Sequence, residues 1–360
     1  MESTMSFSEN KLTVRSPGDL VTAVPYLIGF HPSDGSIVVL ARSGSRIIFA
    51  TREDFPAPGA PARELTDRAE HLVPIVRRQQ PITDLMIIGY GEAGQVDPAL
   101  RTYGHAFTAS GIRVRELLRV SASRIFNLTC NNPACCPAQG TPFDPTTSLV
   151  AVQATAAGQV ALPTRAALAA RIAPVTGTAQ DSMRRATSGA ATRLKALATT
   201  GSTAVYEAGA HALHDALRQH DSGRRIADND LAWLTLLLTR TAVRDLAIDL
   251  TEPHEQHVTF WVDVTRRADQ RLVPAPATLL ALTAWRCGSG PLALMAAERA
   301  LQVDPAYQLA GLLLQALQAG MPPSVFEQAL TEDETRPGRR PTLEQPRHEP
   351  NHDDPGPELP

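Results

Sequence analysis

Lysine is the residue that this chain most obviously lacks. Only Lys11 and Lys195 are present among 34 basic residues in a chain of 360. A P-loop needs a lysine directly after its glycine-rich turn, and neither lysine stands in such a motif. Schiff-base and pyridoxal-phosphate chemistry need a buried lysine. Lys11 falls near the start of the chain, where we expect a loose segment, and Lys195 falls on the surface of a predicted helix. The sequence therefore argues against these reaction classes.

Long apolar runs and a strong charge are also missing. No apolar stretch approaches the roughly 18 residues of a membrane span. The first residues, MESTMSFSENKLTV, lack the basic and apolar regions of a secretory signal. We therefore expect a cytoplasmic protein with no membrane partner. The formal net charge is only −3, so there is no basic field to hold a phosphate backbone, and nucleic acid is not the expected partner.

Cysteine is scarce but concentrated. Three of the four cysteines, Cys130, Cys135 and Cys136, fall within the segment CNNPACCP. In a reducing cytoplasm, such a cluster is more often free, metal-bound or redox-active than a structural disulfide. The three residues are the best candidates for chemistry in the chain.

Three interpretations of the cysteine cluster are consistent with the sequence. As thiolates the cysteines would bind a soft metal such as zinc, but zinc takes four ligands and adjacent cysteines need a tight turn to reach one ion. A fourth ligand would then come from His31 or from a partner subunit. Alternatively, Cys130 pairs with Cys135 or Cys136 in a redox switch, or the three residues simply pack under a turn.

Residues 16–128 alternate between helix and strand signals. The predicted elements are a helix over Gly18–Leu27, strands over Ser36–Ala41 and Arg46–Thr51 joined as a hairpin, a helix over Ala62–Gln79, a buried strand over Leu85–Ile88, a helix starting at Asp97–Pro98 and a last strand over Ile112–Val120. This order predicts an α/β domain with a mixed sheet, following an N-terminal extension over residues 1–15.

The rest of the chain changes character twice. Residues 129–146 are rich in Pro, Asn and Gly and predict an irregular loop after the last strand. Residues 147–330 carry helical signals throughout, which predict an all-helical C-terminal domain. Within it, Leu231–Leu250 is apolar nearly all round and predicts one central helix, capped by Asp228 or Asp230. Residues 331–360 hold seven prolines and eight acidic residues, which predict a disordered tail.

One stretch of the helical region has a repeat-like pattern. Ala293, Ala300 and Pro305 have the spacing of the second helix of a tetratricopeptide repeat, within the segment Ala281–Pro305. We predict one tetratricopeptide-like helical hairpin there. An ordinary hairpin that uses alanine for close packing is the alternative, since a single unit cannot make a peptide-binding array.

A glycine motif follows the strand predicted over Leu85–Ile88. Gly89, Gly91 and Gly94 match GxGxxG, the fingerprint of a dinucleotide site. In such a site the helix opens within the motif, whereas Asp97–Pro98 predicts a helix that starts three residues later. The acid expected after the following strand is also missing. We therefore interpret the motif as a tight loop.

A histidine, an aspartate and an arginine make a second candidate site. His31 and Asp34 fall in the loop before the first core strand, and Arg52 ends the partner strand of the hairpin. Together they would bind an anion or a nucleotide-like ligand at one end of the sheet. The alternative is a hydrogen-bonded turn with an ion pair at the end of the strand.

Four segments carry a resemblance to a known family. They are SPGDLVTAVPYLIGFHPSDGSIVVL, TREDFP, CNNPACCPAQGTP and AERALQVDPAYQLAGLLLQAL, in this order. With them the chain resembles the actinobacterial domain-of-unknown-function 4192 family over residues 16 to about 325. The resemblance implies an α/β domain followed by a helical half. It implies no known reaction.

Two functions are consistent with these features. The first is a cytoplasmic ligand-binding or regulatory protein, in which the α/β domain holds a small molecule and the helical half contacts a partner. The second is an enzyme acting on a small anionic or nucleotide-like substrate at a site with His31, Asp34, Arg52 and the cysteine loop. There the histidine would be the general base and the arginine would hold the anion.

Overall fold

The structure is a computed structural model that describes residues 3–7, 10–57 and 59–328. The predicted disordered tail over residues 331–360 lies outside the described residues. The chain divides between Pro322 and Pro323 into two units, and the larger one contains every element below. The domain boundaries drawn from the sequence within that unit stay predictions.

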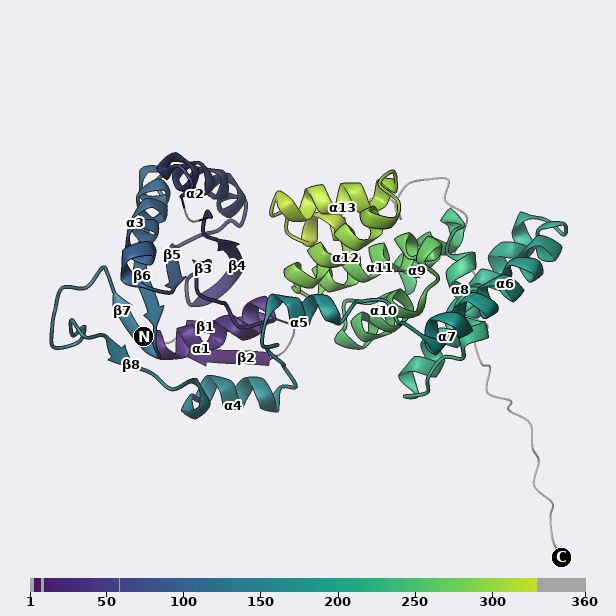
Figure 1. Ribbon diagram of the computed structural model, residues 1–360, viewed down its shortest axis with the longest axis horizontal. Helices are drawn as coiled ribbons and strands as arrows, with labels where there is room; N and C mark the ends of the chain where they lie inside the picture. Colours follow the sequence, from purple (N-terminus) through teal and green to yellow (C-terminus); the bar gives the residue numbers. More distant parts are fainter. Residues whose placement is uncertain (1–2, 8–9, 58, 329–360) are drawn as a thin grey trace, which may run out of the picture. The chain divides into compact units, whose positions relative to one another are not determined.

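A six-stranded mixed sheet forms the N-terminal region, as the strand and helix pattern predicts (Figure 1). Its spatial order is β4-β3-β5-β6-β7-β8. The strands are β3 (Ser36–Ser43), β4 (Arg46–Asp54), β5 (Asp84–Tyr90), β6 (Val114–Ser121), β7 (Arg124–Asn127) and β8 (Thr141–Pro142). β5 and β6 are parallel, and every other neighbouring pair is antiparallel. The predicted hairpin is the β3–β4 pair.

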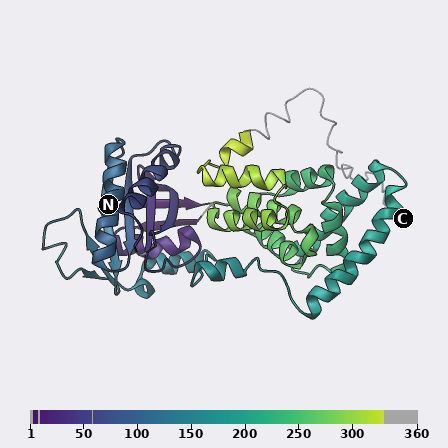
Figure 2. The ribbon, with the colours of Figure 1, turned by 45° about the horizontal axis from the view of Figure 1, so that its top comes forward.

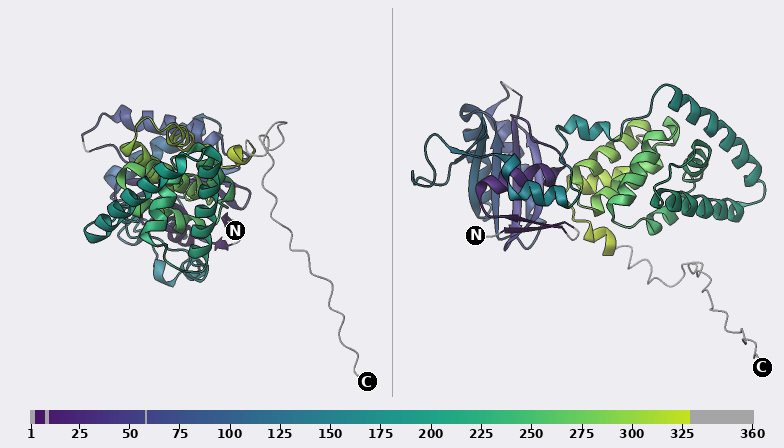
Figure 3. Two further views of the ribbon diagram at one scale, coloured as in Figure 1. Left: turned by 90° about the vertical axis from the view of Figure 1, so that its right-hand side faces the viewer. Right: turned by 90° about the horizontal axis from the view of Figure 1, so that it is seen from below.

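Helices cover both faces of this sheet. Alternate residues of β3 and β5, among them Ile37, Val39, Leu85 and Ile87, are buried against α2 (Ala62–Arg77) and α3 (Ala93–Ala109). α1 (Pro17–Ile28) lies on the opposite side of the sheet (Figures 1 and 3). Every residue of β5 is buried, because a strand covered on both faces has no solvent side.

The N-terminal segment is not the loose extension expected from the sequence. β1 (Ser3–Phe7) and β2 (Asn10–Val14) pair as a separate antiparallel hairpin. Figure 3 shows this hairpin beside α1. Its short strands carry little periodic signal, so no local pattern predicts the hairpin.

The start of α3 was predicted wrongly. The helix begins at Ala93, four residues before Asp97, and contains Pro98 in its second turn. Val96 is fully buried, and a Cβ added at Gly89 would lie 2.4 Å from Val96 Cγ1. The first turn is therefore held by packing on β5, and this contact outweighs the cap-and-proline signal at Asp97–Pro98.

The predicted last strand is not the last. β7 and β8 extend the sheet on either side of the cysteine segment, so residues 128–140 form a connection between two strands and not a linker out of the sheet. Figure 1 shows this connection extending outward from the sheet. Both strands are very short, which is why the pattern of residues did not reveal them.

The following region is helical, as predicted (Figure 2). Its helices are α4 (Leu149–Ala156), α5 (Arg165–Ala170), α6 (Thr178–Ala198), α7 (Ser202–Asp221), α8 (Asp228–Leu237), α9 (Thr241–Leu250), α10 (Glu255–Arg267), α11 (Pro274–Arg286), α12 (Gly290–Val303) and α13 (Gln308–Gln318). Short 3₁₀ turns span Pro145–Thr147 and Gln270–Leu272. Across the described helices, none combines the length and the apolar character needed to cross a membrane.

The single central helix predicted over Leu231–Leu250 is wrong. Two helices, α8 and α9, occupy this stretch, and the Thr239 hydroxyl donates 2.7 Å to the Leu236 carbonyl at the break. A threonine that bonds to a nearby carbonyl competes with helix continuation. Asp228 does not cap α8; it accepts hydrogen bonds from Ser182 and Arg267.

α11 and α12 pack together as a hairpin, and the likeness of this hairpin to a tetratricopeptide unit stays a prediction.

Candidate functional site

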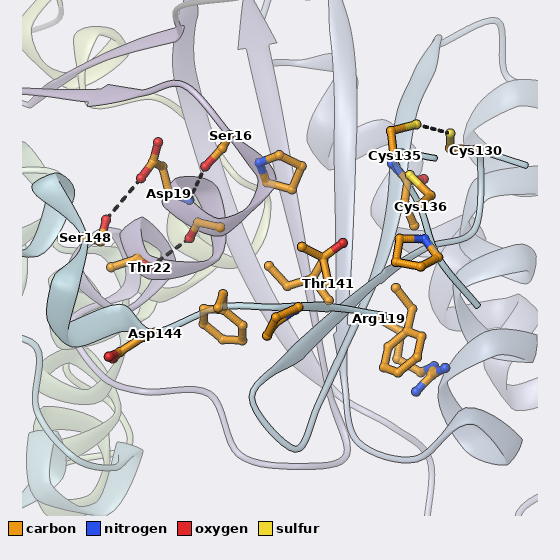
Figure 4. Close-up of a pocket in the computed structure, with 18 of the residues that line it drawn as sticks. Ser16, Asp19, Thr22, Arg119, Cys130, Cys135, Cys136, Thr141, Asp144 and Ser148 are labelled. Carbon is orange, nitrogen blue, oxygen red and sulfur yellow. Dashed lines mark hydrogen bonds between the residues drawn. The ribbon is translucent and has the colours of Figure 1, made fainter. Parts of the chain in front are cut away.

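The cysteine segment lines one end of a cavity of about 660 Å³ in the N-terminal region. The N-terminus of α1 lines the other end, and β6, β7 and residues 141–149 lie between them (Figure 4). Two features that are far apart in the sequence, residues 16–22 and 130–149, are therefore brought to one site.

The α1 end of the cavity is held by its own hydrogen bonds. Ser16 Oγ accepts from Asp19 N at 3.1 Å, and Asp19 Oδ2 accepts from Arg15 N at 3.1 Å. Ser148 Oγ donates to the other Asp19 oxygen at 3.1 Å (Figure 4). The Ser16 hydroxyl thus caps the first turn of α1, while Asp19 holds the backbone of Arg15 before the helix. Through Ser148, Asp19 also joins α1 to the start of α4.

The base of the cysteine loop is fixed by β6 and β7. Arg124 Nη1 donates to the carbonyls of Gln139 and Gly140, at 3.2 and 2.9 Å. Gly140 has φ 75°, and a Cβ there would lie 2.7 Å from the Phe126 ring. Only glycine fits this close approach. The Arg119 guanidinium stacks 3.7 Å above the same ring and donates 2.9 Å to Asp97.

A turn centred on Asn132 brings the cysteines together. The Asn132 carbonyl accepts from the backbone N–H groups of Cys135 and Cys136, at 3.3 and 2.8 Å. The Asn132 side chain accepts from Ala134 N at 3.0 Å. Asparagine forms such turns readily. This is the tight turn that adjacent cysteines require if both are to face one ion.

The three sulfur atoms form a compact group. They all lie within 4.8 Å of one another, and Cys130 Sγ is 3.4 Å from Cys135 Sγ (Figure 4). All are free thiols at or near the surface. A tetrahedral zinc site with Zn–S bonds of about 2.3 Å spaces its sulfurs about 3.8 Å apart, which lies within the observed range. The three thiols therefore fit a soft metal ion without a change of fold.

The thiols differ in acidity. A backbone hydrogen bond from Asn132, and then hydrogen bonds from Cys136 and Cys135, lower the pKa of Cys130. The hydrogen bond with Cys130, and then burial, raise the pKa of Cys136 to about 12. Cys130 is therefore the first thiol of the cluster to lose its proton as the pH rises, and Cys136 keeps its proton until a metal ion displaces it.

His31, Asp34 and Arg52 do not line this cavity. His31 and Asp34 are exposed. Arg52 donates 2.8 Å to Ser36 Oγ and pairs with Asp54 two residues along the same strand. The guanidinium is thus engaged by a strand-end ion pair, which is the alternative that the sequence left open for this group.

The helix after the glycine motif begins where a dinucleotide site requires it. α3 opens within it, one residue before Gly94, and Gly91 has φ 124°. A Cβ at Gly91 would lie 3.6 Å from Asp34 Cβ, so the motif contacts the loop that carries His31. The objection from the helix start is therefore wrong. The second objection holds, because β6 ends at Ser121 without an acid.

Several residues of the cavity were missed by sequence reasoning. Asp19 had a usable signal, since Ser16 and Asp19 have the spacing of a capping box. Arg119 and Phe126 had none, because their contact exists only through the pairing of β6 with the unpredicted strand β7. Ser148 reaches Asp19 across 129 positions of sequence, which no local pattern predicts.

Comparison with known proteins places the chain in a family. The chain matches no curated protein and no solved structure. The sheet, the cysteine segment and the helical region up to α13 all fall within residues 17–324, which match the family model described as "Domain of unknown function (DUF4192)". The chain therefore belongs to the DUF4192 family.

Proposed function

We propose that this protein is a ligand-binding or regulatory protein whose α/β domain holds a zinc ion at Cys130, Cys135 and Cys136. The observation that carries the proposal is the grouping of three thiols within 4.8 Å at the end of a cavity. Soft thiolate ligands select zinc or Cu(I) among common metals.

The number of ligands supports binding over a purely structural role. Structural zinc sites are closed by four protein ligands, whereas sites that act on other molecules keep one position open. Among the described residues, the cluster offers three cysteines, and no histidine or acidic residue joins them as a fourth ligand. The fourth position would therefore face the cavity, where a small ligand with an oxygen or nitrogen donor, or a ligand from a partner subunit, would complete it.

The location and source follow as further proposals. Reduced thiols that bind metal are typical of a reducing compartment, which supports a cytoplasmic location. The resemblance of the four sequence motifs supports an actinobacterial source.

Metal analysis after anaerobic purification tests the zinc proposal. We expect close to one zinc ion per chain, and three cluster thiols that react with a titrant only after a chelator is added. C135S should lose the metal, while C287S is the matched control, because Cys287 is a free, half-buried thiol at the end of α11. Metal-free protein with three freely reactive thiols would contradict the proposal.

A redox switch is a second candidate, favoured by the 3.4 Å separation of Cys130 and Cys135. The Cys130 thiolate would attack a low-molecular-weight disulfide and release one thiol. Cys135 would then attack Cys130 Sγ, release the second thiol and leave a protein disulfide. Mass spectrometry after exposure to oxidised glutathione separates the two candidates. If the protein loses the mass of two hydrogens even when zinc is present, the redox switch is favoured.

The enzyme alternative stays a prediction. It needs His31, Asp34 and Arg52 to share a ligand with the cysteine loop. H31A tests it: if thermal shifts across a panel of anionic metabolites are the same as in the wild type, His31 is not part of such a site.

A further inference from the structure

The helical region contains a second cavity, of about 1330 Å³. It lies against α6, α12 and the turn after α10, and none of the cysteines lines it. Nothing in the motifs of the sequence pointed to this place. Its lining is nevertheless unusual in the kind of polar atoms that it contains.

Three buried donors that line this cavity have no hydrogen-bond partner in the part of the chain that the structure describes. They are Thr187 Oγ1, Arg267 Nε and Arg299 Nη1. Nearly all buried polar atoms in native proteins are hydrogen-bonded, so such a group calls for an explanation. The arginine nitrogens can only donate, and the hydroxyl can donate. A ligand that satisfies all three must therefore carry acceptors.

Arg299 is the central residue of this group. Its Nη2 donates 3.2 Å to the Thr265 carbonyl, and no carboxylate among the described residues forms an ion pair with it. Arg267, by contrast, is paired with Asp228 at 2.6 Å and with Asp263 at 2.8 Å. Arg299 is thus a largely buried cation without a counterion, an arrangement that is costly in the free protein.

The charges around Arg299 also favour the binding of an anion. Burial, and then the charge of Arg266, lower the pKa of Arg299 to about 10. The cavity is lined by five arginines, Arg165, Arg184, Arg267, Arg271 and Arg299, against two acids, Asp269 and Glu298. Of the acids, Asp269 accepts from the Arg271 backbone N–H. Arg184 and Arg267 are paired with acids outside the lining, Asp181, Asp228 and Asp263. The cation that a bound anion would neutralise is therefore Arg299.

Much of the remaining lining is apolar, beside the polar residues Gln180, Ser188, Gln270 and Gln302. The larger apolar side chains of the wall include Met183, Leu236, Leu272, Val273, Met295 and Val303. Ligand sites commonly combine an apolar wall with a few polar groups that fix orientation. This wall suits a hydrocarbon portion, and the donors suit an anionic head.

We propose that this cavity is a binding site for a small amphiphilic anion. The carboxylate or phosphate head is held by Arg299 and Thr187, and the apolar part packs against the methionines and aliphatic residues. Arginine suits this role because its planar guanidinium binds carboxylate and phosphate oxygens in a bidentate manner. The site is separate from the cysteine cluster and does not depend on the metal.

Calorimetric titration of the full chain with octanoate, octyl phosphate and 1-octanol tests the proposal. We expect at least one of the two anions to bind, and 1-octanol, which lacks the charge, to bind at least tenfold more weakly or not at all. The preferred anion identifies the head group. A charge-assisted hydrogen bond is worth about 1.5–3 kcal/mol, so R299M should weaken binding by roughly 10- to 100-fold.

Two further variants keep the test sharp. R299K retains the charge but loses the bidentate fork, and we expect intermediate affinity. R185M is the matched control, because Arg185 is exposed on α6 and does not line the cavity. Ligand-free R299M should unfold at a temperature no lower than the wild type, since it removes an uncompensated charge. The proposal is overturned if neither anion binds the wild type at millimolar concentration, if 1-octanol binds as tightly as the anions, or if R299M and R299K bind like the wild type.

Discussion

Two clusters of polar residues in the N-terminal region show how burial separates stability from binding. At the start of β5, the carboxylate of Asp84 is fully buried and accepts two hydrogen bonds from Arg42, at 2.7 and 2.9 Å. In the cysteine loop, three thiols lie at or near the surface with only weak hydrogen bonds. The first cluster is fully engaged within the protein. In the second cluster the three sulfur atoms are available to bind a metal ion, as a binding site requires.

The charge environment of Asp84 reinforces this difference. Burial alone would raise the pKa of Asp84, but hydrogen bonds and charge from Arg42, with Arg115 and Arg113 nearby, hold it below its ordinary value. The carboxylate is therefore ionised in the folded protein and contributes stability above the unfolded pKa of about 3.9. This stability is lost as the pH falls through the lower folded pKa.

The largest effect is expected from breaking the buried pair. D84N should lower the free energy of unfolding by about 3–5 kcal/mol, because it removes the carboxylate that the buried Arg42 guanidinium pairs with. Urea unfolding at pH 7 measures the change. A loss below about 1 kcal/mol would show that the buried cluster is no more important for stability than a surface pair.

A second substitution tests the packing of the same strand. G89A should cost about 1–3 kcal/mol, since the new Cβ would lie 2.4 Å from Val96 Cγ1. G94A is the matched control: it is two residues into α3 with open space around it, and should be neutral or slightly stabilising. Equal effects of the two variants in thermal unfolding would contradict the account of how α3 begins.

The thiol cluster should respond to pH through metal affinity. Because Cys136 has its pKa raised to about 12, zinc must displace its proton at any physiological pH. The zinc association constant should therefore rise by about tenfold or more per pH unit between about pH 6 and 8. Competition with a chromophoric chelator measures it. An affinity independent of pH would mean that the thiols are not the ligands.

The smallest effect is expected where the cysteines are removed from metal-free protein. C130S and C136S should change the free energy of unfolding by less than about 0.5 kcal/mol, as is usual for sites near the surface. The same variants should lose zinc. A loss of several kcal/mol without metal would instead favour the structural reading, in which the cysteines pack under a turn.

The sequence predicted the parts of the fold that local patterns encode. The buried run at Leu85–Ile88 and the hairpin around Ser43–Gly44 gave β5, β3 and β4 close to their observed bounds. The start of α3 was misjudged because the contact of Val96 with Gly89 is tertiary. β7 and β8 are too short to carry a period, so the setting of the cysteine loop within the sheet was not foreseen.

The candidate sites followed the same rule. Spacing alone marked the three cysteines, but the Asn132 turn that groups their sulfurs became visible only in the folded loop. The cavity around Arg299 gave no signal, because an arginine within an alanine-rich helix is typical of an exposed face. That no carboxylate of the described residues pairs with Arg299 emerges only when α6, α10 and α12 pack together.

X-ray absorption at the zinc edge of the anaerobically purified protein tests the central claim most directly. The account predicts three sulfur neighbours at about 2.3 Å and one oxygen or nitrogen neighbour, which is the coordination of an open three-cysteine site. A shell of four sulfurs would mean that another thiol closes the site. A shell without sulfur would contradict metal binding by the cysteine cluster altogether.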